Sequence, residues 1–170
     1  MKKLFSILML MFFVIGLSIA CQKNVTKPLT KDEVTGERVW QRIIKEENYK
    51  KYGAWPNHKG MQRGQSPHGI FHIAFVNSTL LNALPIKDIK APNGSIIVKE
   101  NYNSSRELKM ITVMAKVEGY YPEEGDWFWG KYTPDGKVLA AGRLKKCAEC
   151  HKSSFDVDND FIVLHKIDEK

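Results

Sequence analysis

The sequence predicts an α+β fold, with one N-terminal amphipathic helix followed by a mainly antiparallel β-sheet of four to five strands. Two periodicities predict it, because apolar residues recur at helical spacing after Thr30 and at a spacing of two from Ile70 onward. A length of 170 residues leaves room for about one domain. With 43% apolar and 11% aromatic residues, the chain is not of the disordered or collagen-like class.

The predicted helix begins with the sequence Thr30-Lys31-Asp32-Glu33, which has the spacing of a capping box. Apolar residues then follow at helical intervals towards Tyr52: Val39, Trp40, Ile43 and Ile44. Glycines and prolines between Gly53 and Pro67 indicate an aromatic-bearing loop after the helix.

Four segments rich in β-branched and aromatic residues predict the strands: Ile70 to Val76, Ser95 to Glu100, Leu108 to Val117 and Asp126 to Thr133. Asn77 and Ser78 can cap a brief helix that runs through Leu84. The segment Ala91 to Gly94 predicts a tight turn, and Pro134-Asp135-Gly136 predicts a hairpin.

The N-terminus has the three parts of an export signal, a basic tip, an apolar centre and small residues before the end. We expect a signal peptide over residues 1–20, with an uncleaved membrane anchor as the alternative.

Ala20-Cys21 resembles the end of a bacterial lipobox, which implies that Cys21 is lipidated. Ser18 stands where a lipobox usually has leucine, so ordinary cleavage into the periplasm stays open. Polar residues 21–32 predict a tether and residues 33–170 the folded domain. We therefore expect a periplasmic or outer-surface protein, held at the membrane surface through Cys21.

The charge pattern indicates a solvated surface. The chain has 26 Lys and Arg against 19 Asp and Glu, and two of these lysines lie in the signal segment. The remaining cations are scattered among acidic residues, so nucleic acid is not an expected partner.

The strongest motif is CxxCH, formed by Cys147, Cys150 and His151, which is the pattern for covalent attachment of a c-type haem. Two thiols three positions apart can add to the two vinyl groups of one haem, and the imidazole then binds the iron. We expect one haem c per chain, with His151 as the metal ligand. A Cys147–Cys150 disulfide, a zinc site and a redox dithiol are the alternatives.

The position of this motif predicts where the haem lies. Only nineteen residues follow His151 and none of them is Met, so a group on the other side of the iron must come mostly from upstream strands. We therefore expect the sheet to pack on the C-terminal haem.

Between about Trp40 and Phe161 the chain resembles the cytochrome P460 and cytochrome c′-beta family, exported mono-haem proteins with a β-rich fold. The motifs that carry the resemblance occur in this order: Pro67-His68-Gly69, Val76-Asn77, Asn93 to Glu100, Val113 to Lys116, Gly125-Asp126-Trp127, the CxxCH and Asp160-Phe161.

The resemblance implies three catalytic candidates, Lys99, His72 and Thr112. In the hydroxylamine-oxidising members, the lysine that matches Lys99 is covalently joined to the haem. A lysine beside a haem in a dry pocket has a lowered pKa, although Lys99 could also extend to water. His72 and Thr112 stand where that type carries an arginine and an acidic group. Thr112 is a poor base, which weighs against fast hydroxylamine oxidation, whereas His72 could accept protons or could be a core histidine.

Aromatic and sulfur side chains are further candidates for the haem pocket. In the c′-beta branch aromatic rings cap the iron face, and Phe71 or Phe75 could do so here or could pack in the core. Trp127 and Trp129 are expected to wall the haem. Met114 as a sixth iron ligand would make an electron carrier. No motif connects the remaining histidines to the iron: His58, His68 and His165.

The expected function is an exported mono-haem cytochrome that binds a small nitrogen-oxide ligand, nitric oxide or hydroxylamine, at an open iron position. Hydroxylamine oxidation or nitric oxide detoxification would be its reaction if it is an enzyme. The alternative is an electron-transfer or gas-sensing cytochrome without turnover. A homodimer and an unidentified redox protein are the expected partners.

Overall fold

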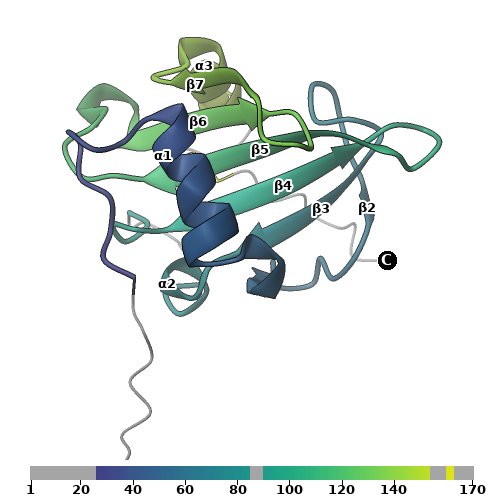
Figure 1. The fold of residues 1–170 in the computed structure, drawn as a ribbon, viewed down its shortest axis with the longest axis horizontal. Helices are drawn as coiled ribbons and strands as arrows, with labels where there is room; N and C mark the ends of the chain where they lie inside the picture. The colour runs from purple at the N-terminus through teal and green to yellow at the C-terminus, as the bar shows by residue number, and fades with distance from the viewer. Residues whose placement is uncertain (1–25, 85–89, 154–159, 163–170) are drawn as a thin grey trace, which may run out of the picture.

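A computed structural model describes residues 26–84, 90–153 and 160–162, and confirms an α+β fold with a mainly antiparallel sheet (Figure 1). Within these residues the sheet has seven strands, in the order β1-β3-β4-β5-β6-β7, with β2 also paired to β3. The prediction of four to five strands was too low. Two of the additional strands, β1 (Gly53–Ala54) and β2 (Gln62–Arg63), are two-residue pairings inside the expected loop, and β7 (Val138–Gly142) completes the predicted hairpin.

The four predicted strands are all present, with ends that differ by a few residues at most: β3 (Phe71–Val76), β4 (Ile96–Tyr102), β5 (Leu108–Lys116) and β6 (Trp127–Tyr132). The predicted turn before β4 forms, because the Ser95 N–H donates to the Pro92 carbonyl at 3.0 Å. Asn77 caps the short helix α2 (Ser78–Leu81) as expected, with its side chain accepting from the Leu80 N–H.

The N-terminal segment differs from the single helix predicted. Glu33 does bond back to Thr30, but this closes a turn and the helix α1 (Gly36–Gln41) starts only after Thr35, whose hydroxyl accepts from the Arg38 N–H at 3.1 Å. A π-helical turn, η1 (Arg42–Glu46), and a 3₁₀ turn, η2 (Tyr49–Lys51), follow. The backbone stays helical from Gly36 through Glu46, and Asn48, with φ at +50°, separates this stretch from η2, so the segment forms two short pieces.

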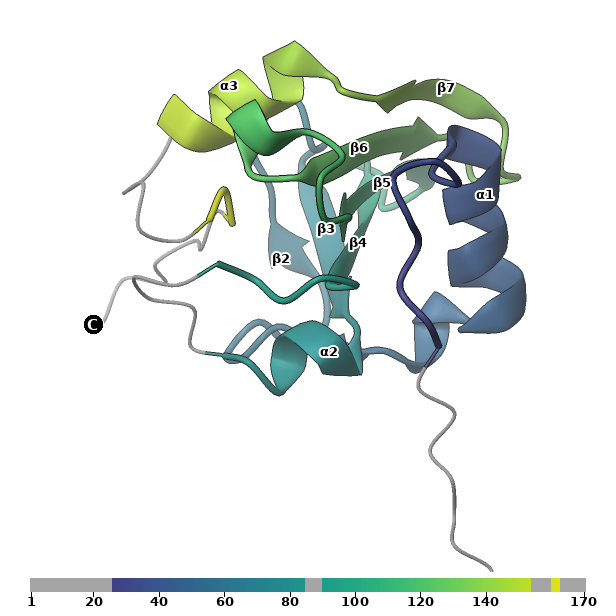
Figure 2. The same ribbon diagram turned by 90° about the vertical axis from the view of Figure 1, so that its left-hand side faces the viewer.

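The sheet has two faces with different coverings (Figure 2). The back face carries Val98, Val113 and Phe128, and α1 and η1 pack on it through Val39 and Ile43. Leu29, inside the predicted tether, is buried in the same cluster. The front face carries Ile97, Met114 and Trp129, and it is covered by α3 (Lys145–Ser153) and by Ile162. The motif-bearing helix and the N-terminal helix therefore lie on opposite sides of the sheet.

The signal segment 1–20, Cys21 and His165 lie outside the described residues. Within the described part, no helix has the length and apolar character needed to cross a bilayer.

Candidate functional site

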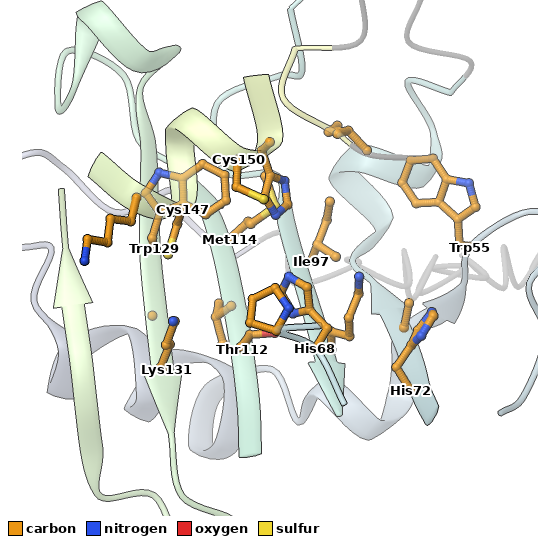
Figure 3. A pocket seen from close by; sticks show the side chains of 18 of the residues that line it. Trp55, His68, His72, Ile97, Thr112, Met114, Trp129, Lys131, Cys147 and Cys150 are labelled. Atoms are coloured by element: carbon orange, nitrogen blue, oxygen red, sulfur yellow. The ribbon is translucent and has the colours of Figure 1, made fainter. Parts of the chain in front are cut away.

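The front face holds a cavity of about 320 Å³ between the sheet and α3 (Figure 3). This volume is within the range of about 300–1,000 Å³ that is usual for small-molecule and cofactor sites. Helix α3 contributes Cys147, Cys150 and His151 to the lining, and the strands contribute most of the rest. The cavity thus combines the CxxCH motif with side chains from residues far away in sequence.

Strand register arranges the front face of the sheet, on which the cavity lies, in two rows. The apolar row consists of Val76, Ile97, Met114 and Trp129, which are paired across β3, β4, β5 and β6. The polar row is separated from the apolar row by two residues on every strand, and it consists of Ala74, Lys99, Thr112 and Lys131. Both rows are on the front face because side chains two apart in a strand point to the same side.

Helix α3 presents the three motif side chains to the cavity together. Cys150 and His151 follow Cys147 by three and four positions, which places all three on neighbouring parts of one helical face. Ala148 is fully buried and fixes the helix on the front face. Burial raises the pKa of the Cys147 thiol.

The His151 ring is held from two sides. Its Nδ1 donates to the Phe161 carbonyl at 2.8 Å, and the Trp129 ring lies edge-on with centroids 4.7 Å apart. Burial lowers the pKa of His151 and outweighs the opposite effect of the Phe161 carbonyl. A neutral imidazole that carries its proton on Nδ1 leaves Nε2 as the nitrogen that can bind a metal.

Lys99 and Thr112 are neighbours in the polar row. Burial lowers the pKa of Lys99 from 10.5 to about 8, in the direction expected for a lysine in a dry pocket. The Thr112 oxygen accepts from the Asn101 side-chain amide at 3.2 Å. Because that oxygen accepts from Asn101, the Thr112 hydroxyl proton can be donated towards the cavity.

Two histidines also line the cavity, one predicted and one not. His72 is buried on the front face and lines the cavity, which places this candidate beside Lys99 and Thr112. No sequence motif connected His68 to the iron, yet its ring lies edge-on to that of His151, with the ring centroids 6.0 Å apart. Burial, and after it the nearby cations, lowers the pKa of His68 to about 3, so the ring is neutral.

The sequence feature that could have identified His68 as a cavity residue is Gly69, which follows it. Gly69 has φ at +78°, and a Cβ on it would stand 2.6 Å from the Tyr102 carbonyl oxygen. Only glycine fits this turn, which brings the loop against β4 and carries His68 over the cavity.

Three predicted haem-pocket residues do not line the cavity. Phe71 and Phe75 alternate with His72 and Ala74 along β3, so their rings lie on the back face. There Phe75 packs edge-on against Tyr49 at 5.3 Å, and Phe71 lies beside the Arg106 guanidinium. Trp127 is on the front face but one row beyond the cavity, where its Nε1 donates to the Asp160 carbonyl at 2.9 Å. Trp129 is the tryptophan of β6 that lines the cavity.

Comparison with known families decides the identity of the fold. The family model described as cytochrome P460 matches residues 47–162, which is most of the chain and includes every strand from β1 to β7 and the CxxCH. The chain belongs to the cytochrome P460 family. A search of curated proteins found no match to it. Membership of the cytochrome P460 family implies a haem cofactor.

The cavity residues fit the haem of a cytochrome P460 protein. The apolar row and Ile162 offer an apolar surface, while two thiols and an imidazole meet at one end. The buried Trp129 Nε1 and His68 Nδ1 have no hydrogen-bond partner in the described chain, so a bound group with acceptors would satisfy them. Among the described residues, no group of three or more His, Cys, Asp or Glu is placed to hold a metal ion.

Proposed function

We propose that this protein is an exported c-type cytochrome with one haem attached through Cys147 and Cys150, and that it binds nitric oxide or hydroxylamine. The observation that supports this proposal most is that one cavity receives the CxxCH from α3 and the polar row from the sheet. When bound, the haem supplies an iron with an exchangeable ligand position and one-electron redox chemistry. His151 is the protein ligand to that iron through Nε2.

The polar row provides the groups that handle a small ligand. Thr112 donates a hydrogen bond into the cavity, and Asn101 fixes its direction by occupying the oxygen. Lys99 has a pKa of about 8, so near neutral pH it can release or take up a proton in the cavity. His72 is a second proton acceptor on the same face.

The residue at position 112 favours ligand binding over fast oxidation. The hydroxylamine-oxidising type carries an acidic group there, and a threonine hydroxyl is a poor base in its place, although Lys99 and His72 lie on the same face. Nitric oxide needs no deprotonation to bind, and a single hydrogen-bond donor is enough to orient it. We therefore favour nitric oxide binding or detoxification over hydroxylamine oxidation.

Export and lipidation are part of the proposal and rest on the N-terminal sequence alone. The basic tip and apolar centre of residues 1–20 direct the chain across the membrane, and Cys21 then carries the lipid. Covalent haem attachment is consistent with this, because c-type haems are attached outside the cytoplasm.

An absorption spectrum of the haem-loaded protein, recorded with and without nitric oxide and hydroxylamine, tests the proposal. We expect a five-coordinate ferrous form that binds nitric oxide, with weaker retention of the ligand in Thr112→Val. A wild-type spectrum that does not change when nitric oxide or hydroxylamine is added would contradict the proposed ligand class.

In the hydroxylamine-oxidising family members, the lysine that matches Lys99 is bonded to the haem. A separate experiment tests for this bond here. A red-shifted ferrous Soret band that Lys99→Ala returns to an ordinary haem c position would establish the bond. Lys131→Ala is the matched control, because Lys131 is the other lysine of the polar row and should leave the band in place. An unchanged band in Lys99→Ala would exclude the bond.

A second candidate function is electron transfer without turnover, and Met114 is the observation that favours it. Its side chain lines the cavity in the apolar row, where a thioether could bind iron. A six-coordinate low-spin spectrum that resists carbon monoxide, and that becomes high-spin in Met114→Leu, would establish this function in place of ligand binding.

A further inference from the structure

An ion pair buried at the end of the front face joins β5 to the C-terminal residues 160–162. The ammonium of Lys116 lies 2.6 Å from the Asp160 carboxylate, and each side chain is only 6% exposed. Lys116 also donates to the Gly125 carbonyl at 2.5 Å and lies over the Trp127 ring, 4.9 Å from its centroid. A pair this deeply buried loses much hydration energy, so it adds little net stability and is often retained because it fixes one arrangement of the chain.

The arrangement that this pair fixes is the backbone at residues 160–162. The Asp160 carboxylate also accepts from the Ala91 N–H at 2.8 Å, and its main-chain carbonyl accepts from Trp127 Nε1. Asp160 and Phe161 have φ at +48° and +66°, a left-handed conformation that side-chain-bearing residues rarely adopt twice in succession. Contacts from outside the segment must hold such a backbone in place.

The left-handed backbone aims one carbonyl at the candidate iron ligand. Directly after Asp160, the Phe161 carbonyl accepts from His151 Nδ1 at 2.8 Å. The Phe161 ring packs closely on Gly125, where a Cβ would come within 2.7 Å of it, and Gly125 is the residue whose carbonyl Lys116 binds. Lys116 therefore contacts the two residues on either side of Phe161 in space, Asp160 through its carboxylate and Gly125 through its carbonyl.

We propose that Lys116 and Asp160 are positioning residues for His151. Their ion pair holds the Phe161 carbonyl on Nδ1, which fixes the ring orientation and keeps the proton off Nε2. This inference rests on the proposed role of His151 as iron ligand. A hydrogen bond from Nδ1 raises the basicity of the other nitrogen, and a more basic ligand favours ferric over ferrous iron.

The reduction potential of the haem-loaded protein is the first measurement. In Lys116→Met/Asp160→Asn the charges are removed together, so no unpaired buried charge remains and folding is retained. We expect the ratio of ferric to ferrous affinity to fall about tenfold, which is a rise of about 59 mV for a one-electron couple. Lys50→Met/Glu100→Gln is the matched control, because it likewise removes both charges of another ion pair, on the back face, and should leave the potential unchanged.

The tautomer of His151 in the full chain without haem is the second measurement, and it does not depend on the proposed function. Nitrogen NMR should find the proton on Nδ1 in the wild type and in Lys50→Met/Glu100→Gln, and substantially on Nε2 in Lys116→Met/Asp160→Asn. A wild-type chain that attaches no haem would refute the proposed function, while its His151 tautomer would still decide the positioning role. A Lys116→Met/Asp160→Asn variant with unchanged tautomer, or with haem bound and unchanged potential, would overturn that role.

Discussion

The charge of Lys99 should lower the free energy of unfolding, because it is buried in the cavity and no carboxylate is present among the described lining residues. A difference of one in pKa is worth about 1.4 kcal/mol, so a pKa lowered from 10.5 to about 8 makes the charged form about 3 kcal/mol less stable in the folded chain than in water. Lys99→Met removes this charge and retains the aliphatic length. We expect the variant without haem to be more stable than the wild type at pH 7, by up to about 3 kcal/mol.

The gain from this substitution should depend on pH with a definite sign. Below pH 8 the lysine is protonated in both folded and unfolded chains, so the full cost is present. Between pH 8 and 10.5 the unfolded chain binds more protons than the folded one, so wild-type stability rises with pH and the difference between the two proteins shrinks. Above pH 10.5 both forms are neutral and the cost is gone.

Urea unfolding of the two proteins at pH 7 and pH 10.5, without haem, measures this difference. Lys109→Met is the control, since Lys109 is an exposed lysine on β5 whose ammonium stays in water. A Lys99→Met variant that is less stable than the wild type at pH 7, or whose gain is the same at both pH values, would show that the Lys99 charge does not destabilise the fold.

Three further predictions concern the fold and the limits of the site. Tyr49→Phe removes a 2.7 Å hydrogen bond to the buried Glu100 carboxylate and should cost about 1.5–3 kcal/mol in urea unfolding at pH 7. Burial alone would raise the pKa of Glu100, but its hydrogen bonds hold that pKa below 4.5, so this cost should shrink as the pH falls through that lowered pKa. Gly136→Ala should lower the melting temperature by several degrees in calorimetry, because φ is +97° and the new Cβ would stand 2.3 Å from the Trp40 indole nitrogen. Phe71→Leu should leave the nitric oxide spectrum of the haem-loaded protein unchanged, since the ring lies on the back face.

The strands were predictable because their signal is local. β3, β4, β5 and β6 alternate β-branched or aromatic residues between turns, and the turn at Pro92 and the Asn77 cap use side chains adjacent to the elements they bound. The CxxCH is equally local, because its three groups lie within one helical turn. The two-residue strands β1 and β2 are too short to show a periodicity, and their pairing to β3 depends on how the loop folds back.

The residues misplaced or missed are those whose position depends on distant contacts. Both faces of β3 carry apolar side chains, so its sequence could not say whether Phe75 or Ala74 faces the cavity. His68 reaches His151 across 83 positions of sequence, which no periodicity records. The Lys116–Asp160 pair likewise joins residues 44 apart.

The N-terminal helix shows how two local signals can compete. Thr30 and Thr35 are both capping residues, and the first closes a turn while the second starts α1. The predicted start at Thr30 was wrong because the capping interaction there closes a turn, and the helix begins only after Thr35.

The mass of the mature chain, produced in cells with an active cytochrome c assembly apparatus, shows whether haem is covalently attached. We expect a coloured protein whose mass exceeds that of the polypeptide by one haem, carried on the peptide with Cys147 and Cys150. Replacing both cysteines by serine should abolish the addition, whereas Cys21→Ser should retain it. A colourless wild-type protein, with those two thiols unmodified or joined in a disulfide, would show that the protein is not a c-type cytochrome.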